Sequence, residues 1–268
     1  MNNITFGFGG EGVIGYIDLQ GKYGDGSFVF TMASTIVNAA SFAVDQSIAP
    51  GSLASIFGTG LAVSTAQAGL SALPSELAAV SVAIGGMPAP LQNVSPTQIN
   101  LQVPWNLPTG AADVRVVTKG FVLPLLRVSI LPYSPAIFAI QEGSGQAAAI
   151  NLDGSIAAPA AAIPGVAARP AKPGDYIMIF GTGLGPVAPA IADGRSAIDG
   201  FRTTLTVPRV LIGGAPAEVT FSGLAPQLAG VNQVNVIVPP VPGGVLPLQL
   251  EIGGLRTPDR VTIAVDGH

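Results

Sequence analysis

Cysteine is absent from this chain, and charged residues are scarce. Without cysteine the 268 residues can form no disulfide, no thiol nucleophile and no cysteine-based metal site. Charged residues make up 10% of the chain, against about a quarter in an ordinary soluble domain. The net charge of -4 provides no basic stripe that could neutralise phosphates. The composition therefore argues against nucleic acid as a partner.

Long hydrophobic runs are also missing. Glycine, proline, asparagine or a charged residue interrupts every apolar stretch, and none approaches the roughly 20 residues of a transmembrane helix. We therefore expect no membrane span. The amino terminus, MNNITFGFGGEGVIGYIDLQ, has neither the basic start nor the continuous apolar core of a signal peptide. We expect either a mature chain or one exported by another route.

What the chain does contain is many short runs of strand character. INLQV at 99–103 alternates three apolar residues with Asn100 and Gln102, and RVTIAVD at 260–266 repeats the pattern. Glycines and prolines, 35 and 24 of them, separate such runs as turns. The best helix candidate is only LPSELAAV at 73–80. Short strands with frequent turn signals predict an all-β chain of antiparallel sandwiches.

Three stretches of sequence occur twice, in the same order along the chain. The pairs are APGSLASIFGTGL at 49–61 with KPGDYIMIFGTGL at 172–184, VAIGGMPAP at 82–90 with VLIGGAPAE at 210–218, and TQINLQVP at 97–104 with NQVNVIVP at 232–239. The spacing between copies grows along the chain, as expected when loops accept insertions and strands do not. The sequence therefore predicts two tandem domains of one fold, residues 34–140 and 141–268, after an amino-terminal segment of residues 1–33.

These repeated stretches also carry a family resemblance. Together with IVNAASF at 36–42, SPTQINLQVPW at 95–105, YSPAIFAI at 133–140 and NLDGSI at 151–156, they resemble the Solibacter-type C-terminal domain family. The PG…FGTGL strand and turn also resembles the immunoglobulin-like IPT/TIG domains. The resemblance covers nearly everything from residue 34 onward. It implies a secreted or cell-surface bacterial protein with immunoglobulin-like sandwiches and no assigned activity, because such domains usually end large exported proteins.

The glycines of the repeated FGTGL stretch allow two interpretations. FGTGLG at 180–185 could cradle a phosphate, but that use needs a following helix, and Pro186 follows instead. We therefore interpret these glycines as residues of positive φ, where a strand turns over the end of a sandwich. They are Gly58, Gly60, Gly181 and Gly183.

The sequence contains few residues that could form a catalytic site. The only histidine is His268, at the very end of the chain, so a Ser-His-Asp arrangement would depend on a chain end. Two carboxylate pairs stay open as glycosidase candidates, Asp153 with Asp175 and Asp193 with Asp199. Most of these acids stand beside glycine in turn contexts such as LDGS and ADGR. We expect no enzyme, no cofactor and no metal site.

Several polar and aromatic residues are candidates for binding. The pairs of the QIN and QVN stretches recur at equivalent places: Gln98 and Asn100, Gln233 and Asn235. We interpret them as hydrogen-bonding partners of neighbouring loops or strands, and a glycan site as the alternative. Trp105 could stack on a sugar ring, but we favour a position at the domain end or between the domains. Asn3 and Asn93 each begin an Asn-X-Ser/Thr acceptor pattern for glycosylation.

The amino-terminal segment of residues 1–33 is the least explained part of the chain. ITFGF at 4–8, GVIGYIDLQG at 12–21 and SFVFT at 27–31 have strand character, and eight glycines separate or interrupt them. The segment is too apolar for a solvated linker and too glycine-rich for a core of its own. Its apolar anchors are Ile4, Phe6, Phe8, Val13, Ile17, Leu19, Phe28 and Phe30.

Two functions from different classes follow from these features. The first is an extracellular structural protein, the subunit of a fibre or filament that self-assembles head to tail. In it, the amino-terminal segment adds as a β-strand to a sheet edge of a neighbouring copy. The alternative is a monomeric cell-surface module for carbohydrate binding or adhesion, in which this segment completes its own domain.

Overall fold

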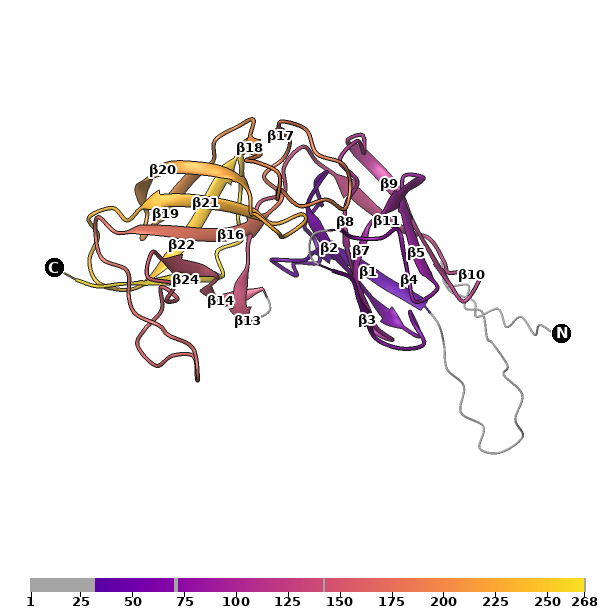
Figure 1. The fold of residues 1–268 in the computed structure, drawn as a ribbon, viewed down its shortest axis with the longest axis horizontal. Helices are drawn as coiled ribbons and strands as arrows, with labels where there is room; N and C mark the ends of the chain where they lie inside the picture. Colours follow the sequence, from indigo (N-terminus) through magenta and orange to yellow (C-terminus); the bar gives the residue numbers. More distant parts are fainter. Residues whose placement is uncertain (1–31, 70–71, 142, 268) are drawn as a thin grey trace.

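The computed structural model describes residues 32–69, 72–141 and 143–267 (Figure 1). Every regular element in the described part is a β-strand. The predicted fold class, all-β with two tandem immunoglobulin-like sandwiches, is confirmed. Residues 1–31 of the predicted strand-forming extension, with Asn3 and the eight anchors between Ile4 and Phe30, lie outside the described residues, as does His268. Met32 and Ala33, which the prediction placed in the extension, are the first residues of the first strand.

The first sandwich consists of two antiparallel sheets. One sheet has the order β1 (Met32–Asn38), β2 (Leu53–Thr59), β8 (Gln98–Gln102), β7 (Leu91–Val94) and β3 (Ala66–Gln67). The other has β6 (Met87–Ala89), β5 (Val80–Ile84), β9 (Gly110–Thr118) and β11 (Leu126–Ile130), with short hairpin strands β4 (Glu76–Leu77) and β10 (Phe121–Val122). This crossing of the chain between two sheets is the immunoglobulin Greek key.

The second sandwich repeats this plan. Its first sheet contains β12 (Ala136–Ile137) and β15 (Ala149–Asn151) against β16 (Tyr176–Thr182), then β21 (Asn232–Ile237), β20 (Ala215–Leu224), β18 (Thr203–Thr204) and β17 (Val187–Ala188). Its second contains β19 (Arg209–Ile212), β22 (Gly244–Ile252), β23 (Leu255–Arg256), β24 (Val261–Val265), β14 (Ser144–Ala147) and β13 (Ala139–Gln141). The long β20 pairs with β19 and with β21, so it joins the two sheets.

The repeated stretches form equivalent strands with the same pairing register. Ile56 of β2 lies opposite Ile99 of β8, and the same positions of the second copy, Ile179 and Val234, lie opposite each other. The β-bulge of the first copy also recurs in the second. In β7 the register shifts between Leu91 and Asn93, and in β20 between Val219 and Phe221. Conserved register and a conserved bulge indicate one ancestral sandwich that was duplicated.

Each sandwich encloses its own hydrophobic core. One cluster of buried residues runs from Ala33 to Ile130 and the other from Ile137 to Val265. The predicted alternation holds, since Ile99, Leu101 and Val103 are all buried. The change from one core to the other lies between Ile130 and Ile137, shortly before the predicted boundary at residue 140.

The helix expected at 73–80 is wrong. Its residues form β4, which turns sharply into β5 through Ala78 and Ala79, both with positive φ (49° and 59°). A segment of one or two turns has no apolar face large enough to hold a helix against a core. Val80 instead enters the sheet and is fully buried.

The prediction of positive φ is half correct for the four glycines. Gly60 and Gly183 have φ values of 65° and 81°. Gly58 and Gly181 do not have positive φ, and lie within β2 and β16. A close neighbouring strand requires glycine at both positions: a Cβ on Gly181 would lie 2.6 Å from the Ala136 carbonyl oxygen, and a Cβ on Gly58 would lie 2.1 Å from the Met32 carbonyl oxygen.

The two sandwiches meet through opposite ends of equivalent strands. The start of β2 touches the end of β16, where the Leu53 N–H donates to the Thr182 hydroxyl oxygen at 2.9 Å. The same hydroxyl donates to the Gly230 carbonyl at 2.8 Å, and its side chain is fully buried. Figure 1 shows the two bodies side by side along the long axis, with β1–β11 in one and β16–β24 in the other.

A loop of the second sandwich also reaches over the end of the first. The Gly194 N–H donates to the buried Gln102 amide oxygen at 2.7 Å, and the Asp193 carboxylate accepts from the Trp105 N–H at 2.7 Å. The Trp105 side chain packs against residues of the second sandwich, including Val187. The expectation that Trp105 lies between the domains is confirmed.

Replacing Gly183 should destabilise the fold more than replacing a matched glycine. Gly183→Ala adds a Cβ that overlaps the Ser134 carbonyl oxygen, on top of the left-handed strain. Gly174→Ala brings only the strain (φ 87°), because nothing lies within 4 Å of the added Cβ. In urea unfolding we expect a loss of about 1–2 kcal/mol for Gly174→Ala and of about 3 kcal/mol or more for Gly183→Ala. Equal losses of unfolding free energy in the two variants would contradict the close approach of Gly183 to the Ser134 carbonyl oxygen.

Thr182→Val should weaken the contact between the sandwiches. The substitution keeps the shape but leaves the Leu53 N–H and the Gly230 carbonyl without their buried partner. We expect a loss of about 2–4 kcal/mol in unfolding free energy, measured by urea titration. Thr203→Val is the control, since Thr203 is exposed and should change the free energy by less than about 0.5 kcal/mol.

Candidate functional site

The acids considered for catalysis are engaged in structural interactions. Arg169 brings Asp153 and Asp175 together, with N–O distances of 2.6 and 3.1 Å. Hydrogen bonds from the Ser155 hydroxyl and from Arg169 hold the pKa of Asp153 well below its ordinary value. A glycosidase needs a carboxylic acid whose pKa is raised so that it can donate a proton. The Asp153 carboxylate has the opposite property.

The second carboxylate pair is divided between separate partners. Asp193 accepts from the Trp105 N–H, whereas Asp199 forms an ion pair with Arg202 at 2.9 Å. Across residues 32–69, 72–141 and 143–267, no group of three or more metal-ligating side chains occurs. Nor does this part of the chain contain a helix long and apolar enough to cross a membrane.

The repeated Gln and Asn side chains bond to each other within their own strands. The Gln98 amide donates to the Asn100 side-chain oxygen at 2.8 Å, and Gln233 donates to Asn235 at the same distance. Asn93 lies in β7 directly opposite Asn100 and is half-buried. These contacts agree with a hydrogen-bonding role inside the sheet.

In the second sandwich, other segments cover the outer edge of β24. β14 runs parallel to it and pairs Gly145 with Val261, and the Gly145 N–H donates to the Arg260 carbonyl at 2.7 Å. Further along, the Ala171 N–H donates to the Ala264 carbonyl at 2.9 Å. β14 belongs to a hairpin inserted between β12 and β15, the two halves of the strand that corresponds to β1.

In the first sandwich, the equivalent edge is largely open. Among the described residues, only the bridge of Ile48 covers this edge of β11: the Ile48 N–H donates to the Ser129 carbonyl at 3.1 Å, and the Ile48 carbonyl accepts from the Leu131 N–H at 3.0 Å. Nearer the start of β11, no strand of the described part pairs with this side. Because the Ser129 carbonyl faces outward, the main-chain groups of Arg127, two residues earlier, face outward too.

Exposed apolar side chains lie beside the start of this open edge. Phe121 and Val122 of β10 are 55% and 41% exposed, and Leu125 just before β11 is 60% exposed. β10 lies at the end of the first sandwich that is remote from the second (Figure 1). An open strand edge next to exposed apolar residues is a typical acceptor for an added strand.

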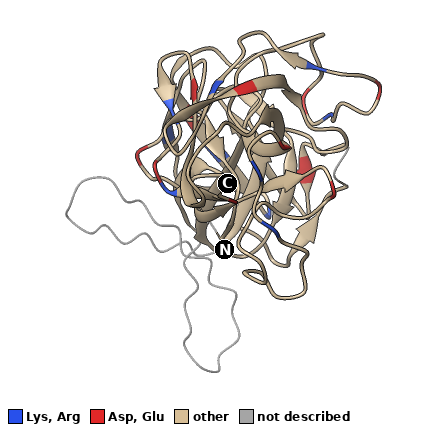
Figure 2. Ribbon diagram, turned by 90° about the vertical axis from the view of Figure 1, so that its left-hand side faces the viewer, with Lys and Arg blue, Asp and Glu red and all other residues tan. Residues whose placement is uncertain are grey.

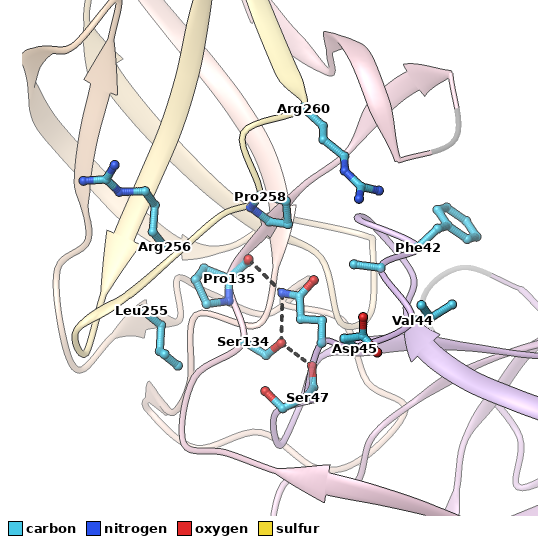
Figure 3. A pocket seen from close by; sticks show the side chains of 12 residues that line it. Phe42, Val44, Asp45, Ser47, Ser134, Pro135, Leu255, Arg256, Pro258 and Arg260 are labelled. Carbon is cyan, nitrogen blue, oxygen red and sulfur yellow. Dashed lines mark hydrogen bonds between the residues drawn. The ribbon is translucent and has the colours of Figure 1, made fainter.

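A groove of about 610 Å³ lies where the two sandwiches join. Figure 3 shows its walls: Phe42, Val44, Asp45 and Ser47 from the loop after β1, facing Arg256, Pro258 and Arg260 from the end of the second sandwich. Gln46 connects the walls, because its amide donates to the Ser134 hydroxyl and the Pro135 carbonyl, both at 3.2 Å.

Elsewhere the surface is poor in charge. Figure 2 shows the charged residues scattered over the ribbon, with no stripe of either sign in that view. Five ion-paired arginines account for much of the positive charge: Arg127, Arg169, Arg202, Arg209 and Arg256.

No protein-family model and no curated protein matches this chain. Among solved structures, it is similar to SGBP-B of a Bacteroides ovatus mixed-linkage glucan utilization locus, in complex with a heptasaccharide (11% identity, 85% of this chain and 45% of that chain, TM-score 0.34). It is also similar to domains 5–6 of the S-layer protein SbsC (11%, 88% and 99%, 0.29) and to the Yersinia pseudotuberculosis adhesin InvE (10%, 88% and 58%, 0.23). The chain spans less than half the length of SGBP-B. These similarities are weak, so we base the function on the chain's own geometry.

Sequence reasoning missed both the open edge of β11 and the groove. Which edge stays open depends on the hairpin that contains β14, and no local pattern in β11 reports it. The groove residues Asp45 and Arg260 stand far apart in the chain. The one available signal was the stretch from Phe42 to Ser47, which has no counterpart among the repeated stretches.

The Asp153–Arg169 contact should make stability depend on pH in a defined direction. Because the folded-state pKa of Asp153 lies below its ordinary value of 3.8, the carboxylate stabilises the fold above that pH. Its contribution is lost as the pH falls through the lowered pKa. Asp153→Asn should therefore unfold at lower urea than the unmodified chain at pH 7, with a gap that narrows below about pH 4. Asp266→Asn, an exposed control, should show no gap, and a gap that widens in acid would contradict the assignment.

Proposed function

We propose that this chain is the subunit of an extracellular fibre, in which residues 1–31 of one copy add as a strand to the outer edge of β11 in the next. The observation that carries the proposal is the difference between the two sandwiches. The edge of β24 is covered by β14, whereas the same edge of β11 has, within the part of the chain that the structure describes, only the Ile48 bridge. The pairing of β14 with β24 is therefore an example, within the same chain, of how a strand could be added to the outer edge of β11.

The contact between the sandwiches supports head-to-tail assembly. It joins the start of β2 to the end of the equivalent strand β16, so the two surfaces are different. Contacts between unlike surfaces continue into rings or filaments instead of closing as two-fold dimers. β1 begins opposite the end of β2, at Thr59, remote from this contact. Met32, the first residue after the proposed donor segment, therefore lies at the end of the body where a neighbouring copy would be met.

The chemistry of the amino-terminal segment suits an open edge. Alternating residues Ile4, Phe6 and Phe8 give a strand one apolar face. The exposed Phe121, Val122 and Leu125 offer an apolar surface beside the edge of β11. Each buried anchor would contribute about 1.5–3 kcal/mol before ordering costs. The main chain of the segment would supply hydrogen bonds to the outward groups of β11.

Proline at position 127 tests the acceptor edge. Arg127→Pro removes an outward N–H without breaking the pairing with β9, whereas Arg127→Ala removes the same side chain and keeps the N–H. We expect the full chain and Arg127→Ala to form fibres visible by electron microscopy. Arg127→Pro, and a chain lacking residues 1–31, should sediment as folded monomers. Fibres formed equally well by Arg127→Pro would rule out this edge.

Mixing two defective chains then distinguishes donation of the amino-terminal segment to another copy from pairing of the segment with its own domain. Arg127→Pro keeps the donor segment but lacks the acceptor, and the shortened chain keeps the acceptor but lacks the donor. A 1:1 mixture should give a heterodimer that grows no further, measured by sedimentation. If the full chain stays monomeric at high concentration and the mixture stays as two monomers, the segment completes its own domain. A monomeric surface-binding module is then the function.

A further inference from the structure

The groove at the junction of the sandwiches presents an unpaired arginine. Arg256 beside it is held by Glu251, and the carboxylate of the adjacent Asp259 is taken by the Gln249 amide. The Arg260 side chain has no ion pair or hydrogen bond in the part of the chain that the structure describes. In Figure 3 its guanidinium extends into the groove toward the loop of the first sandwich.

The opposite wall presents a carboxylate and an aromatic ring. Asp45 is exposed and, among the described residues, its side chain pairs with neither Arg260 nor any other partner. Phe42 has a φ of 52°, a backbone conformation that bulky residues rarely adopt. The turn that holds it is fixed by hydrogen bonds to Asn38, from the Phe42 and Ala40 N–H groups. The Phe42 ring lies at the rim of the groove and packs against Phe57, with 5.9 Å between the ring centroids.

We propose that this groove binds an acidic sugar, a uronic acid residue of a polysaccharide. The planar Arg260 guanidinium matches the sugar carboxylate and can bind it with two parallel hydrogen bonds. The Asp45 carboxylate accepts hydrogen bonds from sugar hydroxyls. The Phe42 ring packs against the apolar face of the sugar ring. Each of the three groups matches one part of a uronic acid.

The same residues disfavour other anions. A phosphate group could also pair with Arg260, but it has no apolar ring face for Phe42 and few hydroxyl donors for Asp45. A neutral sugar would leave Arg260 without its counter-charge. The groove has walls from both sandwiches. The Gln46 amide ties the loop after β1 to the Pro135 carbonyl on the other wall. The loop that forms one wall is therefore held against the other before a ligand binds, which reduces the ordering cost of binding.

Equilibrium dialysis of the full chain with two trisaccharides tests the proposal. The probes are the trimer of galacturonic acid and the trimer of galactose, which differ in their carboxylates. Dialysis reports binding whether the chain is monomeric or assembled. We expect the acidic trimer to bind at least about tenfold more tightly than the neutral one, since a charged hydrogen-bonding pair commonly contributes a factor of this size. Equal binding of both trimers, or binding of neither, would overturn the proposal.

Two arginine variants locate the site. Arg260→Gln should weaken binding of the acidic trimer by about tenfold or more. Arg115→Gln is the matched control, since Arg115 is an exposed arginine of β9 outside the groove and its replacement changes the net charge equally. Phe42→Leu should also weaken binding while leaving the preference for the acidic trimer. Equal losses in Arg260→Gln and Arg115→Gln would show a general charge effect and overturn the site.

Discussion

The arrangement of the two sandwiches depends on the buried hydroxyl of Thr182. It accepts a hydrogen bond from Leu53 and donates one to Gly230, with its side chain fully buried. A buried polar group of this kind tolerates no slippage, because any shift leaves a donor and an acceptor without partners. The contact therefore holds the start of β2 against the end of β16. It also fixes the relative position of the walls of the groove.

The two sandwiches share one plan and differ in how one edge is covered. Register and bulge recur in both copies, so the strands themselves carry little that is particular to either domain. The hairpin that contains β14 covers the edge of β24, whereas none of the residues from 32 onward that the structure describes forms an equivalent insertion over β11. An uncovered edge is a hazard for a soluble protein, and its retention beside exposed apolar side chains supports our assignment of a role in assembly.

Charged residues are scarce in this chain, and the acids considered for catalysis have structural roles. Asp153, Asp175 and Asp199 are held by arginines, and Asp193 caps a main-chain N–H, so all four acids considered for catalysis have structural partners. Asp45 and Arg260 differ from these four acids, because they face one groove and their side chains pair with no partner among the described residues. The proposed fibre contact and the proposed sugar site both use groups that have no partner among the described residues.

The sequence by itself determined the all-β class, the inward positions of strands such as β8, the duplication, and the positive φ of Gly60 and Gly183. All of these follow from local patterns: a period of two, recurring stretches, and a turn that only glycine adopts readily. The close approach at Gly58 and Gly181, the strand in place of a helix before Val80, the open edge of β11 and the groove were decided by the tertiary structure alone. Each depends on which distant segment lies beside the residue, and the physical reason is that edge pairing and domain contact join residues far apart in the chain, whose neighbours no local pattern reports.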